Sequence, residues 1–351
     1  MATPPVRSMN QDKPSPQLLP IQQDFRWGYI NRAGTLVIKP QFDSAEEFSD
    51  GLAFVRYSIR EKPLKPGETA PEIILGAGFI DETGKVVLEL ESPFYLAGDG
   101  FIEGLTKFWT WEAGKGNLYG YIDKTGKVQI KPQFSYAHEF FEGLAAVCLD
   151  QKCGFIDKTG EFVIAPTYRM TFPFSDGFAV VSMDHEKVGF VNRVGELVIE
   201  PQFGNFHPVF KEGLAPVAYP NGKYGYIDTQ GLLVIPMHFD QAQPFSEDLA
   251  GVSVNAKWGY IDKSGKFVIE PKFRSASPFS EGVAPVNSEP GEARTEQTGT
   301  GTGYIDKTGK MVITLKFDGA LSFVGGIARV YVEGKFGYID KKGNYIWKPT
   351  R

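Results

Sequence analysis

One pattern of apolar and polar residues recurs nine times along the chain. In its clearest copy, residues 257–271, the order is Lys-Trp-Gly-Tyr-Ile-Asp, then the polar Lys-Ser-Gly-Lys, then Phe-Val-Ile-Glu-Pro. Two short apolar runs joined by a polar turn that contains glycine predict a β-hairpin. The basic period is the 34 residues from Gly225 to Gly259, which indicates a repeat protein. The glycine of the first run falls at Gly28, Gly78, Gly120, Gly154, Gly189, Gly225, Gly259, Gly303 and Gly337.

A further apolar run precedes each hairpin and predicts a third strand in every repeat. In the unit above it is Leu-Ala-Gly-Val at residues 249–252. The hairpin's first strand has apolar residues on both faces, with Trp258 and Tyr260 on one and Ile261 on the other. A strand with one face in water would alternate apolar and polar residues. Neighbouring units must therefore cover both faces of this strand, which a single small unit cannot do alone.

We therefore predict an all-β array of nine three-stranded β-meander units over residues 18–351. Residues 1–17 are polar and proline-rich, and we expect them to form a disordered leader. An open β-solenoid is favoured, because propellers usually have about four to eight blades of about four strands. A β-propeller remains the alternative, since the linker between units could supply a short fourth strand.

The linker between units is predicted to be an irregular loop. In residues 273–282 its apolar residues follow a helical spacing, but Pro278 lies inside the pattern and argues against a helix. We expect its two phenylalanines, Phe273 and Phe279, to pack under the sheet.

The repeated aspartate of the hairpin turn is the most frequent candidate for chemistry. Asp262 and its counterparts could bind a cation if the turns stacked, but Asn31 and Asn192 replace two of them. A lysine also follows most of them, as Lys263 follows Asp262, and it would oppose a cation. We therefore predict that these residues cap turns, and that there is no metal site and no cofactor.

Charge and hydropathy exclude several classes of partner. The formal net charge is −5, so nucleic-acid binding has little electrostatic support. No apolar run reaches the length of about 20 residues that a membrane helix needs, which predicts no membrane span. The first residues lack the apolar core of a signal peptide, so we expect a cytoplasmic protein.

The repeat resembles the bacterial WG-repeat (KWG-repeat) family. The resemblance rests on the Lys-Trp-Gly-Tyr-Ile-Asp run that starts at Lys257 and on the Arg-Trp-Gly-Tyr-Ile-Asn run that starts at Arg26. It extends over roughly residues 18–349. The tryptophan is replaced by Tyr224, Cys153 or other residues elsewhere, which is typical of a packing position. The resemblance implies no established activity.

The strongest candidate for a binding site is a group of aromatic residues in the third repeat. The group comprises Tyr95, Phe101, Trp109 and Trp111. Trp109 and Trp111 share one face of a predicted strand, and this repeat also carries one of three insertions that should lie on one rim of the array. The alternative is that these aromatic residues seal an irregular junction between the second and third units.

The two cysteines permit two interpretations. Cys148 and Cys153 flank a predicted hairpin loop and could face each other in a disulfide. Alternatively, Cys153 takes the position of Trp258 and packs as a small apolar side chain.

We predict a non-catalytic scaffold whose rim binds a protein or peptide partner. The alternative is a carbohydrate-binding or cell-wall-binding module that stacks sugars on the rim aromatics, which makes a glycan the second candidate partner. No acid–base or nucleophile–base set is visible in the sequence, so we expect no enzyme activity.

Overall fold

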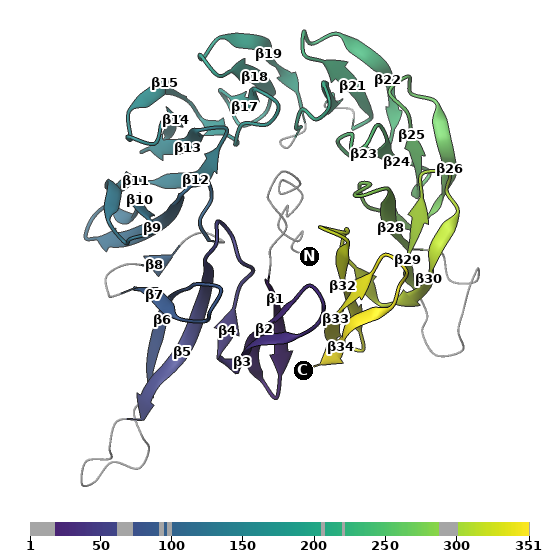
Figure 1. Cartoon of the computed structure of the whole chain (residues 1–351). Coiled ribbons are helices and arrows are strands. Elements are labelled where there is room, and N and C mark those ends of the chain that lie inside the picture. Colours follow the sequence, from purple (N-terminus) through teal and green to yellow (C-terminus); the bar gives the residue numbers. More distant parts are fainter. Residues whose placement is uncertain are drawn as a thin grey trace. The chain divides into compact units, whose positions relative to one another are not determined.

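The computed structural model describes residues 18–61, 73–90, 95–96, 100–204, 208–219, 222–287 and 301–350. These residues form antiparallel β-sheets and contain no helix (Figure 1). The predicted leader at 1–17 and most of the insertions at 62–72 and 288–300 lie outside the described residues.

Nine sheets occur in the described part of the chain, and each is made of consecutive strands. In chain order they are β1 (Leu18–Gln23), β2 (Arg26–Asn31) and β3 (Leu36–Phe42); β4 (Ser44–Ala45), β5 (Ala53–Glu61), β6 (Ile73–Ile80) and β7 (Val86–Glu89); β8 (Tyr95–Leu96), β9 (Leu105–Glu112), β10 (Gly116–Asp123) and β11 (Val128–Phe134); β12 (Tyr136–Phe141), β13 (Leu144–Leu149), β14 (Lys152–Ile156) and β15 (Phe162–Tyr168); β16 (Met170–Thr171), β17 (Phe178–Ser182), β18 (Val188–Asn192) and β19 (Leu197–Phe203); β20 (Leu214–Ala218), β21 (Tyr224–Asp228) and β22 (Leu233–Phe239); β23 (Gln241–Ala242), β24 (Ala250–Val254), β25 (Lys257–Ile261) and β26 (Phe267–Phe273); β27 (Ser275–Ala276), β28 (Val283–Asn287), β29 (Thr302–Asp306) and β30 (Met311–Phe317); and β31 (Gly319–Ala320), β32 (Ile327–Val332), β33 (Lys335–Asp340) and β34 (Tyr345–Thr350).

The linker supplies a fourth strand, so the prediction of three-stranded units is wrong for seven of the nine sheets. In the eighth sheet, Ser275 pairs with Asn287 and Ala276 with Val286. This edge strand ends two residues before Pro278, which cannot donate a ladder hydrogen bond. Four-stranded antiparallel sheets of this kind are the blades of a β-propeller.

By its contacts the described chain divides into two compact units. One consists of Leu18–Asn31 and Thr35–His238, and the other includes Arg32–Gly34 together with Phe239–Arg351. This division does not test the predicted leader at residues 1–17 or the predicted single array over residues 18–351. The blades within each unit repeat the same packing.

The preferred open solenoid is wrong, and the β-propeller named as the alternative is the fold. Between consecutive blades of the second unit, the turn glycine of one blade packs on the last strand of the preceding blade. A β-carbon on Gly343 would lie 3.1 Å from Cγ2 of Ile313. Within the same unit, a β-carbon on Gly34 would lie 3.2 Å from Cγ2 of Ile346 in the last blade. An open array would leave its last blade without such a partner turn.

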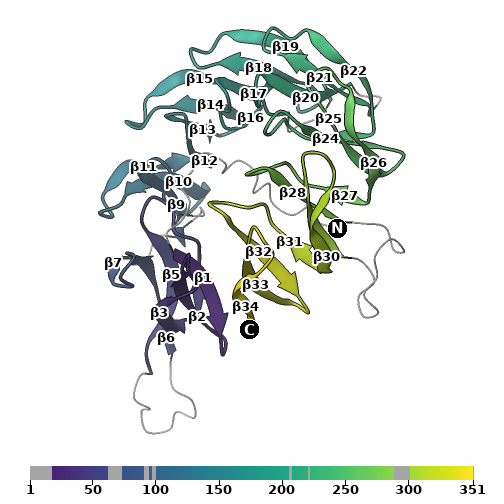
Figure 2. The ribbon, with the colours of Figure 1, turned by 45° about the vertical axis from the view of Figure 1, so that its right-hand side comes forward.

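The glycine of the repeat is required by space. Trp258 pairs with Phe273 and Tyr260 with Ile269, so β26 has a bulge between these pairs. Figure 2 shows β26 beside β25 in this blade. A β-carbon on Gly259 would lie 2.4 Å from the carbonyl oxygen of Ile269. Every glycine of the nine copies meets the backbone of the following strand in this way, which explains why no other residue occupies the position.

Of the two phenylalanines that were assigned to the linker, Phe279 packs against the sheet as predicted, whereas Phe273 is the last residue of β26. The ring centroids of Tyr260 and Phe279 are 4.8 Å apart, and both side chains are fully buried. The hydroxyl of Tyr260 donates a hydrogen bond to the carbonyl oxygen of Ser277 at 2.8 Å. Tyr260 therefore contacts the segment that follows β27 in the next blade, and this segment covers its side of the repeat's central strand. The same aromatic pair recurs as Tyr29–Phe48, Phe79–Phe101, Tyr121–Phe140, Phe155–Phe174, Phe190–Phe210 and Tyr304–Phe323.

Candidate partner-binding surface

One end of the blades carries the tight turns, and polar contacts between neighbouring blades occupy it. The carboxylate of Glu281 accepts a hydrogen bond from the backbone N–H of Gly326 at 2.8 Å. It also forms an ion pair with Lys341 at 3.0 Å, and both partners belong to the next blade. Glu281 itself has a φ of 55° in a two-residue turn. The lysine after the turn aspartate therefore joins blades, a role that the sequence did not reveal. Equivalent carboxylates are Glu103, Glu142 and Glu247.

The turn aspartates cap their own turns, as predicted. Oδ1 of Asp123 accepts hydrogen bonds from the N–H of Thr125 at 2.9 Å, the hydroxyl of Thr125 at 2.6 Å and the N–H of Lys127 at 3.1 Å. The Thr125 hydroxyl is the main reason that the pKa of Asp123 is lowered to about 2. No group of three or more His, Cys, Asp or Glu residues in the described chain is arranged to hold a metal ion.

These turns are expected to make the protein sensitive to acid. A carboxyl whose pKa is lower in the folded state stabilises the fold above its unfolded pKa of about 4, and this stabilisation is lost as the pH falls through the folded pKa. We expect the melting temperature to fall between about pH 4 and pH 2 for this reason. Replacing Asp123, Asp157, Asp262 and Asp306 with asparagine, which Asn192 already provides in one turn, should reduce that fall. Thermal melts of both proteins at several pH values test this, and an unchanged acid dependence would contradict it.

The predicted tryptophans lie at the opposite end of the blades, near the hairpin that joins β9 and β10. Trp111 is 65% exposed, whereas Trp109 is half-buried and pairs with Tyr119 across the sheet. Lys107 lies on the same strand two residues before Trp109, as the alternation of a strand requires. Of these three residues, Lys107 contacts the next blade, where its Nζ donates a hydrogen bond to the carbonyl oxygen of Ala137 at 3.2 Å.

Of the other two predicted site residues, Phe101 lies in the core and Tyr95 lies on the strand next to Trp109. Phe101 is fully buried, and its ring centroid is 4.7 Å from that of Phe79. Phe101 is therefore the core phenylalanine of its linker and cannot contribute to an exposed rim. Tyr95 lies on β8, where its backbone pairs with that of Trp109.

Sequence reasoning missed a row of rings that continues from the tryptophan strand across two further blades. Ring centroids are 6.3 Å apart for Tyr119 and Tyr136, 5.0 Å for Tyr136 and His138, and 6.2 Å for His138 and Phe172. We call these four residues the aromatic row. Tyr136 is 49% exposed, and the other three are partly buried. The alternation of Tyr136 and His138 about buried Ala137 is the signal that could have identified this segment as a strand.

A largely buried ion pair lies beside the aromatic row, and its two charges neutralise each other. Nζ of Lys107 is 3.0 Å from Oε1 of Glu139, and their side chains are only 13% and 17% exposed. Burial, reinforced by Lys107, lowers the pKa of His138 to about 4, so this imidazole is neutral at physiological pH. Burial, reinforced by Glu139, raises the pKa of Tyr136, so its hydroxyl stays protonated. The aromatic row is thus an uncharged surface.

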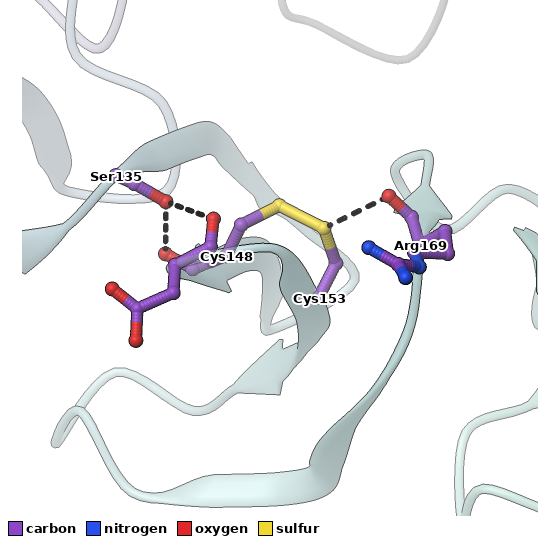
Figure 3. The surroundings of a disulfide bond; sticks show 5 residues. Ser135, Cys148, Cys153 and Arg169 are labelled. Atoms are coloured by element: carbon purple, nitrogen blue, oxygen red, sulfur yellow. Dashed lines mark hydrogen bonds between the residues drawn. A yellow bond between two sulfur atoms is a disulfide. The ribbon is translucent and has the colours of Figure 1, made fainter.

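A disulfide holds the hairpin next to Tyr136. Cys148 and Cys153 are bonded, and they face each other directly across β13 and β14 (Figure 3). Cys153 is also buried, so it fills the packing position as well. The hydroxyl of Ser135 donates to the carbonyl oxygens of Cys148 at 3.1 Å and Asp150 at 3.0 Å. Tyr136 pairs with Cys148 in the register, so the disulfide is adjacent to the aromatic row.

Comparison with known proteins identifies the repeat. The family model for the WG containing repeat matches more than half of the chain, at residues 27–58, 119–153, 154–184, 189–224, 224–258, 258–289 and 303–336. The chain belongs to the WG-repeat family. In this WG-repeat protein the tryptophan position is a packing site, because Trp27 and Trp258 are half-buried and each packs against a cluster of buried apolar side chains.

Solved structures resemble this WG-repeat protein at low sequence identity. The computationally designed protein Ika8 is 10% identical, with 94% of this chain and 98% of that chain covered and a TM-score of 0.47. BamB from Moraxella catarrhalis is 11% identical, with 94% and 95% covered and a TM-score of 0.46. Hsv2p from Kluyveromyces lactis is 11% identical, with 71% and 94% covered and a TM-score of 0.41. A search of curated protein sequences finds no match. Within the described residues, no helix has the length and hydropathy required to cross a membrane.

Proposed function

We propose that this WG-repeat protein is a non-catalytic scaffold that binds a protein or peptide partner through the aromatic row together with Trp109 and Trp111. The observation that carries the proposal is the exposure of Trp111 and Tyr136 on blades whose other large aromatic side chains are mostly buried. Tryptophan and tyrosine are the residues that most often contribute the binding energy of a protein interface. The strand of Trp111 is connected to Tyr136 through Trp109, which pairs with Tyr119, whose ring centroid is 6.3 Å from that of Tyr136. Exposed apolar groups that are grouped on one surface usually mark such an interface.

The chemistry of this surface supports binding more than catalysis. Lys107 and Glu139 form an ion pair with each other, and His138 is neutral at physiological pH. A general base needs a free proton-accepting group within reach of a substrate. If this protein catalysed a reaction, its catalytic groups would have to be residues other than Lys107, Glu139 and His138. A cytoplasmic location remains a prediction, which fractionation of the source cells would test.

The carbohydrate alternative rests on Trp111, whose exposed ring could stack on a sugar. Rings that serve as sugar platforms present flat faces to the ligand. In the aromatic row the neighbouring ring planes are instead inclined by 61°, 81° and 44°. The four rings therefore share no single flat face, which supports a peptide as the first candidate.

The proposal is tested with a surface variant and a matched control. Trp111→Ala combined with Tyr136→Ala removes the two exposed rings, and Tyr345→Ala removes a 40% exposed ring on the last blade. Tagged proteins are used to capture partners from a lysate of the source cells. We expect a protein retained by the wild type and the control to be lost from the double variant, by at least about tenfold. Equal retention by all three proteins would contradict the proposal, provided that their melting temperatures agree.

A further inference from the structure

We propose that the Cys148–Cys153 disulfide is a thiol–disulfide exchange site, which a dithiol reduces by attack on Cys148, and that reduction loosens the segment that carries Tyr136. The inference concerns the hairpin of β13 and β14 and does not depend on the identity of a partner. It follows from the place of the disulfide in the hairpin, from the unequal burial of its two cysteines, and from the hydrogen bonds that the hairpin tip makes to residues 135–137.

The disulfide adds little to the fold of its blade. Cys148 and Cys153 are direct partners in the strand register, and the bond closes a loop with a sequence separation of only 5. A disulfide stabilises a protein mainly by restricting the unfolded chain, and this effect is smallest for short loops. The other blades form the same hairpin without cysteine, and in the next blade Ser182 and Val188 take the place of the two cysteines. The blade should therefore stay folded when the bond is reduced.

The two cysteines differ in their access to a thiol. Cys148 is half-buried, whereas Cys153 is only 3% exposed. Lys152 and Arg169 bring two positive charges to this hairpin, where Lys152 donates a hydrogen bond to Thr167 and Arg169 donates one to Gln151. These charges favour the approach of a thiolate, which is the reactive form of a thiol. Attack on Cys148, with Cys153 as the leaving group, is therefore the expected direction.

The exchange is balanced with a dithiol as the reductant. One thiolate of the dithiol attacks Sγ of Cys148, the bond between the two protein sulfurs breaks, and Cys153 leaves as a thiolate that takes a proton from water. The second thiolate of the dithiol then attacks the dithiol sulfur of the mixed disulfide and releases Cys148, which is protonated in the same way. Two electrons pass to the protein, and the dithiol becomes a disulfide.

The reduced state has a hydrogen-bond acceptor ready for one of its new thiols. Sγ of Cys153 lies 3.6 Å from the carbonyl oxygen of Arg169 (Figure 3). A disulfide sulfur has no hydrogen to donate, so this contact becomes a hydrogen bond only when Cys153 carries a thiol. The contact therefore favours the reduced state.

The tip of the disulfide hairpin holds the segment that carries Tyr136. The N–H of Ser135 donates to the carbonyl oxygen of Cys148 at 2.9 Å, and its hydroxyl donates to the carbonyl oxygens of Cys148 and Asp150 at 3.1 and 3.0 Å. Tyr136 is the next residue and pairs with Cys148. When the disulfide breaks, the hairpin tip gains freedom and these hydrogen bonds open more often. The redox state would thus regulate part of the proposed binding surface.

Reaction with oxidised glutathione tests which cysteine is attacked. Cys153→Val leaves Cys148 alone and Cys148→Ser leaves Cys153 alone, and each change introduces the residue type that the Ser182–Val188 pair has at that position. We expect Cys148 to form a mixed disulfide at least about tenfold faster than Cys153, as measured by mass spectrometry of the folded variants. Equal rates, or a faster reaction of Cys153, would overturn the assignment of Cys148.

Reduction of the wild type tests the device itself. We expect dithiothreitol to reduce the disulfide without denaturant, and the reduced protein to melt at the same temperature as the double variant Cys148→Ser, Cys153→Val. Amide hydrogen exchange of residues 135–137 should become at least about threefold faster on reduction, while the hairpin of β17 and β18 is unchanged. In the double variant, exchange should be fast with or without dithiothreitol. Reduction that requires denaturant, or unaltered exchange at residues 135–137, would overturn the inference. Neither measurement uses a partner, so either failure would leave the proposed function standing.

Discussion

Replacing Gly259 with alanine is expected to destabilise the protein by about 4 kcal/mol or more, or to prevent folding of the blade that contains β25. The added methyl group would lie 2.4 Å from the carbonyl oxygen of Ile269, 2.7 Å from the N atom of Pro271 and 2.9 Å from the carbonyl carbon of Glu270. All three are backbone atoms of β26, so no side-chain rotation can relieve the overlap. The bulge of β26 over the glycine would have to open, with loss of ladder hydrogen bonds. Chemical denaturation of the purified variant measures the effect.

Gly319→Ala is the matched control for this experiment. It makes the same chemical change in a strand, but its nearest neighbour would be a ring carbon of Tyr331 at 3.6 Å, an ordinary contact. We expect a change of no more than about 1 kcal/mol, in either direction, because alanine also restricts the unfolded chain. If the two variants were equally stable, close approach of the backbone would not be the reason for the repeated glycine.

Replacing Phe101 with alanine is expected to cost about 3–5 kcal/mol, the range found for phenylalanine truncated in a core. Its ring is fully buried and packs on Phe79, which in turn packs on Phe54 at 5.5 Å. The carbonyl oxygen of Phe101 also accepts a hydrogen bond from the hydroxyl of Ser49 in the preceding blade. The truncation would therefore leave a cavity between two blades. Equilibrium unfolding in urea measures the loss.

Trp111→Ala provides the contrast within the same group of predicted residues. Because its side chain is 65% exposed, we expect this change to alter the free energy of unfolding by less than about 1 kcal/mol while weakening partner binding. A large loss of stability in Trp111→Ala, or none in Phe101→Ala, would show that the two residues have been assigned to the wrong environments.

The candidate surface could be only partly predicted, because aromatic residues close in sequence need not share an environment. Trp109 and Trp111 lie two residues apart on one strand, β9, as predicted, since the presence of a strand depends on local geometry. The burial of Phe101 depends on its contact with Phe79, which belongs to the preceding blade and is distant in the sequence. The aromatic row combines residues of three blades, and no local pattern connects Tyr119 with Phe172.

The sequence by itself determined the repeated strands, the capped turns and the glycine position. Each of these depends on interactions within a few residues, as in the hydrogen bonds from Thr125 and Lys127 to Asp123. Only the tertiary structure decided the fourth strand and the choice of propeller over solenoid. A strand of two residues, such as Ser275–Ala276, has no intrinsic stability and exists because β28 pairs with it and because Phe279 anchors the segment that follows on Tyr260. The contact between Gly34 and Ile346 likewise joins residues at opposite ends of the sequence, and its free energy comes from packing that only the folded chain creates.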